Sequence, residues 1–354
     1  MILTAQEVKI NILKPYDRVY YNSNMPSVEV MAYAGRYFNS HGELECTVWD
    51  RECLLYRFSQ NFMAAMGDSA RLSFSFNLEP GFYRVELKKD GRLENECVIG
   101  YEPELIRKEG IIRDSCGNFE KYWNSKIKEL ATYPSLTKVE RIKQLSKGAR
   151  NIYRVTINSY GGKSLKGYYA APKERGLYKV LLKVIPLKDS LSFEKLGQSI
   201  ASDTLTGRIT FVAGSRESLD IVRFIDFLQE QEGVSLGNIF LEGEKEAACH
   251  ALVAAAIDRR ISAVALYAPR RSEYEGADRD GYSNPLLAAA NLAKPLLFGV
   301  DITGKAADPT ENFLIYNNAN CKKSYYIFLE GKEATLWRPL KENFFDKYTT
   351  YLLY

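Results

Sequence analysis

The sequence predicts an α/β protein in which a doubly wound, mostly parallel sheet follows a small all-β sandwich domain. Up to about residue 106, short runs alternate polar and apolar residues, which is typical of half-buried antiparallel strands. Beyond that point, almost wholly apolar runs alternate with stretches of helical spacing, as strands buried on both faces of a sheet require. A length of 354 residues suits two domains. We therefore predict an Ig-like β-sandwich over residues 1–106 and an α/β domain over residues 107–354.

Period-two alternation marks the strands of the N-terminal domain. Glu43–Val48, Leu72–Phe76 and Tyr83–Leu87 each place apolar side chains at every second position. The turn dipeptides Pro80-Gly81 and Asp90-Gly91 lie between such runs. This spacing of short strands and turns favours a sandwich of antiparallel sheets.

The second domain is marked by apolar runs separated by helical segments. An antiparallel pair is expected at 153–157 and 167–172, before the parallel strands. The predicted buried strands are 180–185, 209–212, 239–241, 264–267, 295–298 and 325–328. The predicted helices are 119–130, 219–228, 247–257, 309–317 and 340–353. Strands and helices in this order predict a sheet covered by helices on both faces.

Composition and charge exclude several classes of function. The 48 Lys and Arg residues against 44 Asp and Glu give a net charge of +4, without the basic and aromatic clusters of a nucleic-acid surface. No run is long and uncharged enough to span a membrane. The six cysteines lack metal-ligand spacing, so we predict no metal and no cofactor. As written the chain predicts a cytoplasmic protein; a removed signal peptide would make it periplasmic or secreted.

One segment has the layout of a nucleophile elbow but lacks the nucleophile. The apolar strand Ile239–Leu241 leads into Gly243-Glu244-Lys245-Glu246-Ala247, and an alanine-rich helix follows. In α/β-hydrolases this strand, turn and helix carries Gly-x-Ser-x-Gly, with the serine on a strained turn. Lys245 stands in the place of that serine, and the chain has no Gly-x-Ser-x-Gly elsewhere.

Motifs spread along most of the chain resemble a known family. They are Leu78–Val85, Gly100–Pro103, Phe119–Trp123, Val155–Ser159, Lys166–Tyr168, Arg223–Phe227, Ala254–Asp258, Pro309 and Tyr316-Asn317. No single motif is specific, but their order and spacing resemble the acetyl xylan esterases and cephalosporin C deacetylases, in the form with an N-terminal β-domain. The resemblance implies an α/β-hydrolase-like fold and work on acetylated polysaccharide. It also implies a homo-oligomer as one outcome, because relatives often form rings.

The resemblance assigns positions to the catalytic triad. The family's elbow reads Gly-Gly-Ser-Gln-Gly-Gly, its acid precedes a Cys-Pro-Pro turn, and its histidine follows a glycine after the last strand. Matched residue by residue, these positions hold Lys245, Gly304 and Lys332. Asp301 lies near the acid's position, and His250 lies about one turn into the helix after the elbow, where a core histidine is the better interpretation. Loss of a whole triad lowers turnover by about a millionfold.

The substituted positions suggest ligand-binding candidates. Lys245 and Lys332 are expected to converge at the carboxyl edge of the sheet, where they would hold a carboxylate, sulfate or phosphate. Asp301, Glu244 and Glu246 are further ligand-binding candidates. Because Glu244 and Glu246 flank Lys245, neutral pairing of these charges is the competing interpretation. A third interpretation is that a lysine at this place acts as a nucleophile.

We therefore expect a catalytically inactive acetyl xylan esterase-like protein that acts as a binding or scaffold component. Its expected partners are an acetylated glycan or an anionic small ligand. The alternative is an active carbohydrate acetyl esterase with non-standard residues, for which Ser215 and Ser218 are the nearest serines in loop context. A purely structural module is a third class that no sequence feature singles out.

Overall fold

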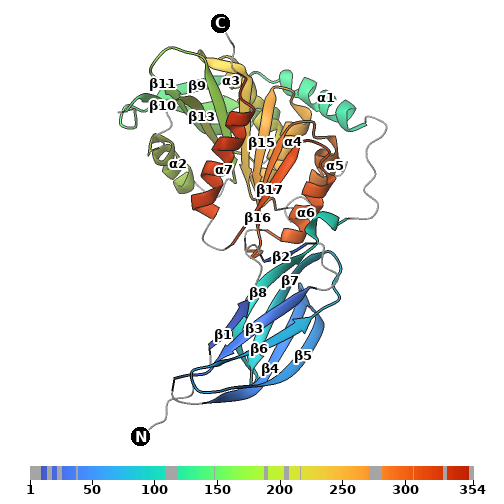
Figure 1. Cartoon of the computed structure of the whole chain (residues 1–354). Helices are drawn as coiled ribbons and strands as arrows, with labels where there is room; N and C mark the ends of the chain where they lie inside the picture. The colour runs from blue at the N-terminus through green and yellow to red at the C-terminus, as the bar shows by residue number, and fades with distance from the viewer. Residues whose placement is uncertain are drawn as a thin grey trace. The chain divides into compact units, whose positions relative to one another are not determined.

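The structure is a computed structural model that describes most of the chain in two compact units. The units are Met1–Arg107 with Phe328–Glu330, and Lys108–Ile327 with Gly331–Tyr354 (Figure 1). The described residues are 9–13, 18–21, 26–36, 39–107, 118–146, 148–186, 190–202, 207–215, 217–270, 281–305, 307–329 and 333–350.

The N-terminal unit is built from two sheets that share one apolar core. One sheet has the order β1-β3-β6 and the other β2-β8-β7-β4-β5. The strands are β1 (Lys9–Leu13), β2 (Val19–Tyr20), β3 (Ser27–Tyr33), β4 (Ser40–Asp50), β5 (Cys53–Ala64), β6 (Ser69–Ser75), β7 (Gly81–Lys89) and β8 (Arg92–Tyr101), followed by the short 3-10 helix η1 (Pro103–Leu105). All described pairings are antiparallel except β2 with β8. Val30 and Phe74 from the first sheet share a core cluster with Val48, Val85 and Ile99 from the second.

The second unit contains a nine-stranded sheet of order β17-β16-β15-β14-β12-β13-β11-β10-β9. The strands are β9 (Thr137–Arg141), β10 (Arg150–Asn158), β11 (Ser164–Pro172), β12 (Tyr178–Ile185), β13 (Arg208–Gly214), β14 (Val234–Glu244), β15 (Ile261–Tyr267), β16 (Leu296–Asp301) and β17 (Lys323–Phe328). Neighbours among β12 to β16 pair in parallel, and β9, β10 and β11 continue the sheet antiparallel. Every residue of β13 and β16 is buried, as strands covered on both faces must be.

Successive side chains of a strand point to opposite faces of the sheet, so their contacts show which helices cover each face. The helices are α1 (Asn118–Ala131), η2 (Tyr160–Gly162), α2 (Ser190–Ser202), α3 (Ser218–Gln229), α4 (Glu246–Ile257), α5 (Pro285–Asn291), α6 (Pro309–Asn318) and α7 (Glu333–Lys347). Phe211 of β13 packs on Phe224 and Phe227 of α3, whereas Phe240 of β14 stacks on Phe345 of α7. Helices α2 and α7 share the face opposite to α3 and α4 (Figure 1).

The predicted fold class is confirmed, with local differences. The predicted strands and the antiparallel pair β10 and β11 are present, while α2, α5 and β9 were not foreseen. We expected the last helix at 340–353, after Pro339. This expectation was wrong in its bounds, since α7 begins at Glu333 and continues through Pro339, although proline favours the start of a helix. No helix among the described residues is long and apolar enough to cross a membrane.

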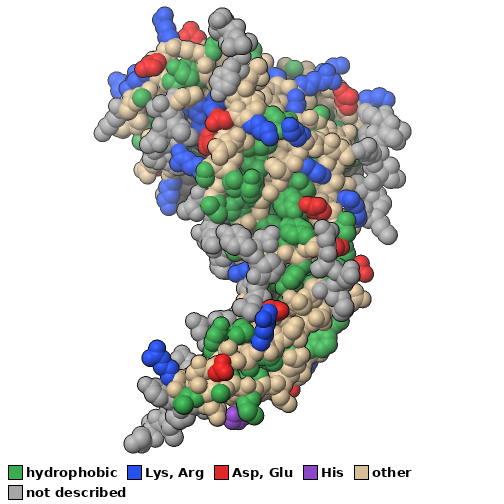
Figure 2. All heavy atoms as spheres, in the orientation of Figure 1, with side chains coloured by type: hydrophobic (Ala, Val, Ile, Leu, Met, Phe, Trp, Pro, Cys, Tyr) green, Lys and Arg blue, Asp and Glu red, His purple; other side chains and the backbone are tan. Residues whose placement is uncertain are grey.

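The surface and the cysteines bear on the expected partners. On the face drawn in Figure 2, basic side chains lie scattered among acidic and apolar ones. Cys46, Cys53, Cys97, Cys249 and Cys321 are free thiols, and the described residues contain no cluster that could hold a metal ion. The absence of a nucleic-acid partner stays a prediction.

Candidate functional site

The turn between β14 and α4 has the backbone geometry of a nucleophile elbow. Lys245 is its single residue, with φ 53° and ψ −124°. Its N–H donates to the carbonyl of Tyr267 at 2.9 Å, and its carbonyl accepts from the N–H groups of Ala248 and Arg270 at 3.1 and 3.2 Å. A residue other than glycine at positive φ is strained, and such strain gathers at functional sites. Lys245 therefore stands in the conformation that the elbow imposes on a nucleophile.

Gly243 explains why the chain turns so tightly here. A Cβ atom at this position would lie 2.7 Å from the Cα of Ala248 and 2.7 Å from the Cβ of Ala251. Only a residue without a side chain lets α4 pack this closely on β14. Small side chains at the start of α4 meet the same requirement, so Ala247 stands where Gly-x-Ser-x-Gly has its second glycine.

The strain at Lys245 gives a first testable prediction. Lys245→Gly is expected to stabilise the protein by about 1 kcal/mol, because relief of the positive φ exceeds the extra entropy that glycine brings to the unfolded chain. Lys245→Ala removes the same ammonium group without relieving the backbone and should give no gain. Chemical denaturation of the three proteins checks this. Equal stability of the Gly and Ala variants would show that the turn is unstrained.

The acidic neighbours of Lys245 pair with other cations. Glu244 accepts from the ammonium group of Lys183 at 2.6 Å, and Glu246 pairs with Arg270 at 3.0 Å. Lys245 is half-buried, and within the described parts of the chain its ammonium group makes no ion pair. The two carboxylates considered as its neutralising partners are thus engaged elsewhere.

The predicted acid position lies in the turn after β16. Asp301 is the last residue of β16, and its Oδ1 accepts from the N–H and the hydroxyl of Thr303 at 2.9 and 2.6 Å. Gly304 follows with φ 72°, and the nearest atom to a Cβ built there is Cδ of Pro309 at 3.7 Å. Lys332 lies outside the described residues, so its convergence with Lys245 stays a prediction.

His250 lies within α4, one turn after the elbow. Burial lowers its pKa to about 4, so the imidazole is neutral at neutral pH. Its neighbour Cys249 is fully buried and directs its thiol at the carbonyl of Arg270, 3.4 Å away. Cys249 is buried in α4, whereas His250 is half-buried there, and the core interpretation of His250 stays a prediction.

The lowered pKa of His250 predicts an acid-sensitive fold. Below pH 6.5 the unfolded chain binds a proton at this histidine that the folded chain does not bind until about pH 4. Stability is therefore complete above pH 6.5 and falls by about 3 kcal/mol as the pH drops through that window. His250→Gln should flatten this part of the stability-against-pH curve. The exposed His41→Gln is the control, and an unchanged slope in His250→Gln would contradict the assignment.

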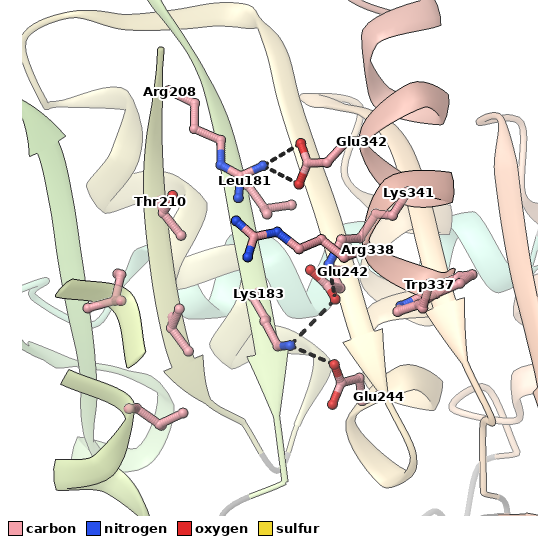
Figure 3. A pocket seen from close by; sticks show the side chains of 13 residues that line it. Leu181, Lys183, Arg208, Thr210, Glu242, Glu244, Trp337, Arg338, Lys341 and Glu342 are labelled. Atoms are coloured by element: carbon pink, nitrogen blue, oxygen red, sulfur yellow. Dashed lines mark hydrogen bonds and ion pairs between the residues drawn. The ribbon is translucent and has the colours of Figure 1, made fainter. Parts of the chain in front are cut away.

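A buried ion network beside the elbow was not foreseen. Glu242 is fully buried and pairs with Lys341 of α7 at 2.6 Å and with Lys183 of β12 at 3.5 Å (Figure 3). Burial alone would raise the pKa of Glu242, but the two ammonium groups outweigh it and hold the pKa below its usual value. A sequence signal existed, since Lys183 and Glu242 each interrupt an otherwise apolar strand.

Comparison with known proteins identifies the fold. No protein-family model matches the chain. The structure is similar to an acetyl xylan esterase from Paenibacillus sp. R4 with a TM-score of 0.56 and 15% identity, covering 70% of this chain and 99% of that one. Acetyl xylan esterase 1 from Thermoanaerobacterium sp. JW/SL YS485 gives a TM-score of 0.55 and 15% identity over 66% and 94% of the chains. The protein has the α/β-hydrolase fold of the acetyl xylan esterases.

A sequence relative supports the same likeness. The acetyl esterase Axe7A of Xylanibacter ruminicola is 23% identical over 235 residues, which are 56% of this chain and 53% of the relative. The chain therefore spans about half the length of the curated relative it matches. The predicted resemblance is confirmed at the level of an acetyl xylan esterase-like fold with additional N-terminal β-sheets.

Proposed function

We propose that this acetyl xylan esterase-like protein is catalytically inactive and serves as a binding or scaffold component in carbohydrate metabolism. The observation that carries the proposal is the lysine at the elbow, held in the strained backbone conformation that belongs to a nucleophile. Acyl transfer by a triad needs a hydroxyl or thiol that an adjacent base deprotonates. A protonated lysine side chain has no lone pair with which to attack an ester.

The surroundings of the elbow support loss of the remaining machinery. Gly304, at the predicted acid position, has no side chain, and the nearby carboxylate of Asp301 is engaged by Thr303. His250 is half-buried on α4 and neutral at neutral pH, and the histidine position of the triad is predicted to hold Lys332. An acid without a base and a nucleophile has nothing to orient.

A binding role follows from the charge at the same place. Lys245 directly follows β14, at the carboxyl edge of the parallel strands, and is the N-cap residue of the twelve-residue helix α4. That arrangement suits an anionic group, such as a carboxylate, sulfate or phosphate. The fold's relatives act, by their names, on acetylated substrates, so an acetylated glycan is the second ligand class. The proposal also includes a homo-oligomer, formed through a surface that the inactive protein has retained.

An active esterase is the alternative, and the preserved elbow favours it. A strained turn that serves no purpose would be expected to relax toward glycine. Residual activity would then come from residues other than a serine on the elbow.

The experiment measures hydrolysis of p-nitrophenyl acetate and of acetylated xylo-oligosaccharide by the full chain. We compare wild type, Lys245→Ala and the triple variant Lys245→Ser/Gly304→Asp/Lys332→His. A Cβ at Gly304 would have its nearest neighbour 3.7 Å away, and aspartate is among the residues that enter the left-handed region at this φ of 72°. Wild type at the uncatalysed rate supports the proposal. Turnover by wild type that Lys245→Ala leaves unchanged would overturn it.

A further inference from the structure

A pocket lies on the sheet face that α2 and α7 cover, between these two helices. It has a volume of about 390 Å³ and is lined from β12, β13, β14, α2 and α7 (Figure 3). That volume falls within the usual range of small-molecule sites, about 300–1,000 Å³. The lining lies mainly along the sheet face and reaches the elbow region only at Glu244. The pocket is therefore a different place from the turn at Lys245.

Six of the seven charged side chains that line this pocket pair with one another, and the seventh, Arg338 of α7, is exposed. Arg208 of β13 binds both carboxylate oxygens of Glu342 of α7, at 2.5 and 2.6 Å. On the other side, Glu242 and Glu244 are paired with Lys183, and Glu242 is also paired with Lys341. A charged ligand would have to displace one of these pairs, and breaking a buried pair costs several kcal/mol. The part of the pocket lined by these six paired side chains thus favours a ligand without net charge.

Two buried oxygen atoms in the pocket lack partners in the described part of the chain. Glu242 is fully buried and Thr210 is 4% exposed, yet Oε2 of Glu242 and Oγ1 of Thr210 make no hydrogen bond there. An ionised carboxylate oxygen accepts only, so it requires a donor from the occupant of the pocket. A hydroxyl group supplies that donor and can also exchange a hydrogen bond with a threonine hydroxyl.

The rest of the lining suits the carbon skeleton of such a ligand. Leu196 and Ile200 of α2 lie on one side, and Trp337 of α7 lies on the other. An indole ring offers a broad apolar surface to a ring that carries hydroxyls at its edges. Polar and apolar groups from both the sheet and the helices form the mixed lining of a small-molecule site.

We propose that the pocket between α2 and α7 binds a small, neutral, polyhydroxylated molecule, a sugar or a cyclic polyol. Its hydroxyls donate to Oε2 of Glu242 and bond to Oγ1 of Thr210. This inference goes beyond the proposed function and does not depend on it, because it concerns neither the elbow nor the loss of activity.

The test is isothermal titration calorimetry with the full chain. The neutral probes are D-xylose, xylobiose and myo-inositol, and the charged probes are L-glutamate and inorganic phosphate. At least one neutral probe is expected to bind more tightly than either charged probe. Thr210→Val should weaken that binding about fivefold, the effect of one neutral hydrogen bond, because valine replaces the hydroxyl of threonine with a methyl group. Leu196→Trp should abolish binding by filling the pocket.

Two control variants make the result decisive. Thr137→Val changes an exposed threonine of the edge strand β9 and should leave binding unchanged. Lys245→Ala should also leave it unchanged, whereas binding that this variant removes would belong to the elbow site of the proposed function. The inference is overturned if no neutral probe binds at millimolar concentration, if only a charged probe binds, or if folded Thr210→Val and Leu196→Trp both bind like wild type. In the first case the pocket holds water only.

Discussion

Glu242→Gln is expected to destabilise the second unit by about 3–5 kcal/mol, the usual effect of removing one partner from a buried ion pair. Glu242 is fully buried between Lys183 and Lys341, and its lowered pKa keeps it ionised at neutral pH. The glutamine keeps the size of the side chain but leaves the buried Lys341 ammonium group without its countercharge. Denaturant unfolding of the full chain measures the loss in free energy of unfolding, which is taken from the transition of the second unit.

Matched variants separate this network from surface charge. Glu140→Gln removes an acid of the same type from an exposed pair with Lys138, and should change stability by less than about 1 kcal/mol. Glu242→Leu/Lys341→Leu removes both charges of the buried pair and should recover part of the loss, since no unpaired charge remains on α7. If Glu242→Gln is as mild as Glu140→Gln, the buried carboxylate does not hold these two lysines.

The sequence predicted the fold well where the pattern is local. Central strands such as β13 are continuous apolar runs, and α4 is an alanine-rich segment, so period and composition identify both. Helix α2 was not predicted, because its serines and Gly197 weaken the helical propensity of the segment. A Cβ at Gly197 would lie 2.9 Å from the ring of Tyr168, so the glycine serves packing on the sheet rather than the helix itself. The boundary between residues 106 and 107 stays a prediction.

The candidate site was predictable only in part, because its contacts cross the sheet. The elbow position of Lys245 could be predicted from the spacing of Gly243 and the following helix. The partners of Glu242 and Glu244 could not, since Lys183 faces them only through the parallel register of β12 with β14. Lys341 enters from α7, 99 residues beyond Glu242 in the chain. Such pairing depends on tertiary packing, which no local pattern encodes.

Gly243→Ala is expected to destabilise the protein by about 2–3 kcal/mol, because the new methyl group overpacks the contact between β14 and α4. Its Cβ would stand 2.7 Å from Ala248 and Ala251, and backbone atoms of α4 must move to admit it. Gly237 lies in the same strand and is exposed, and a Cβ atom at this position would meet no other atom within 4 Å. Gly237→Ala should therefore leave stability unchanged or raise it slightly, by up to about 1 kcal/mol.

The comparison of these two glycine variants tests the elbow itself. The strained turn at Lys245 exists because α4 starts immediately after β14 and folds back against Gly243. A methyl group at residue 243 pushes the helix away and so must disturb the turn, whereas one at residue 237 does not reach it. Thermal unfolding of both variants beside wild type measures the difference. If Gly243→Ala is as mild as Gly237→Ala, the helix does not approach the strand closely, and Lys245 does not occupy a nucleophile's position.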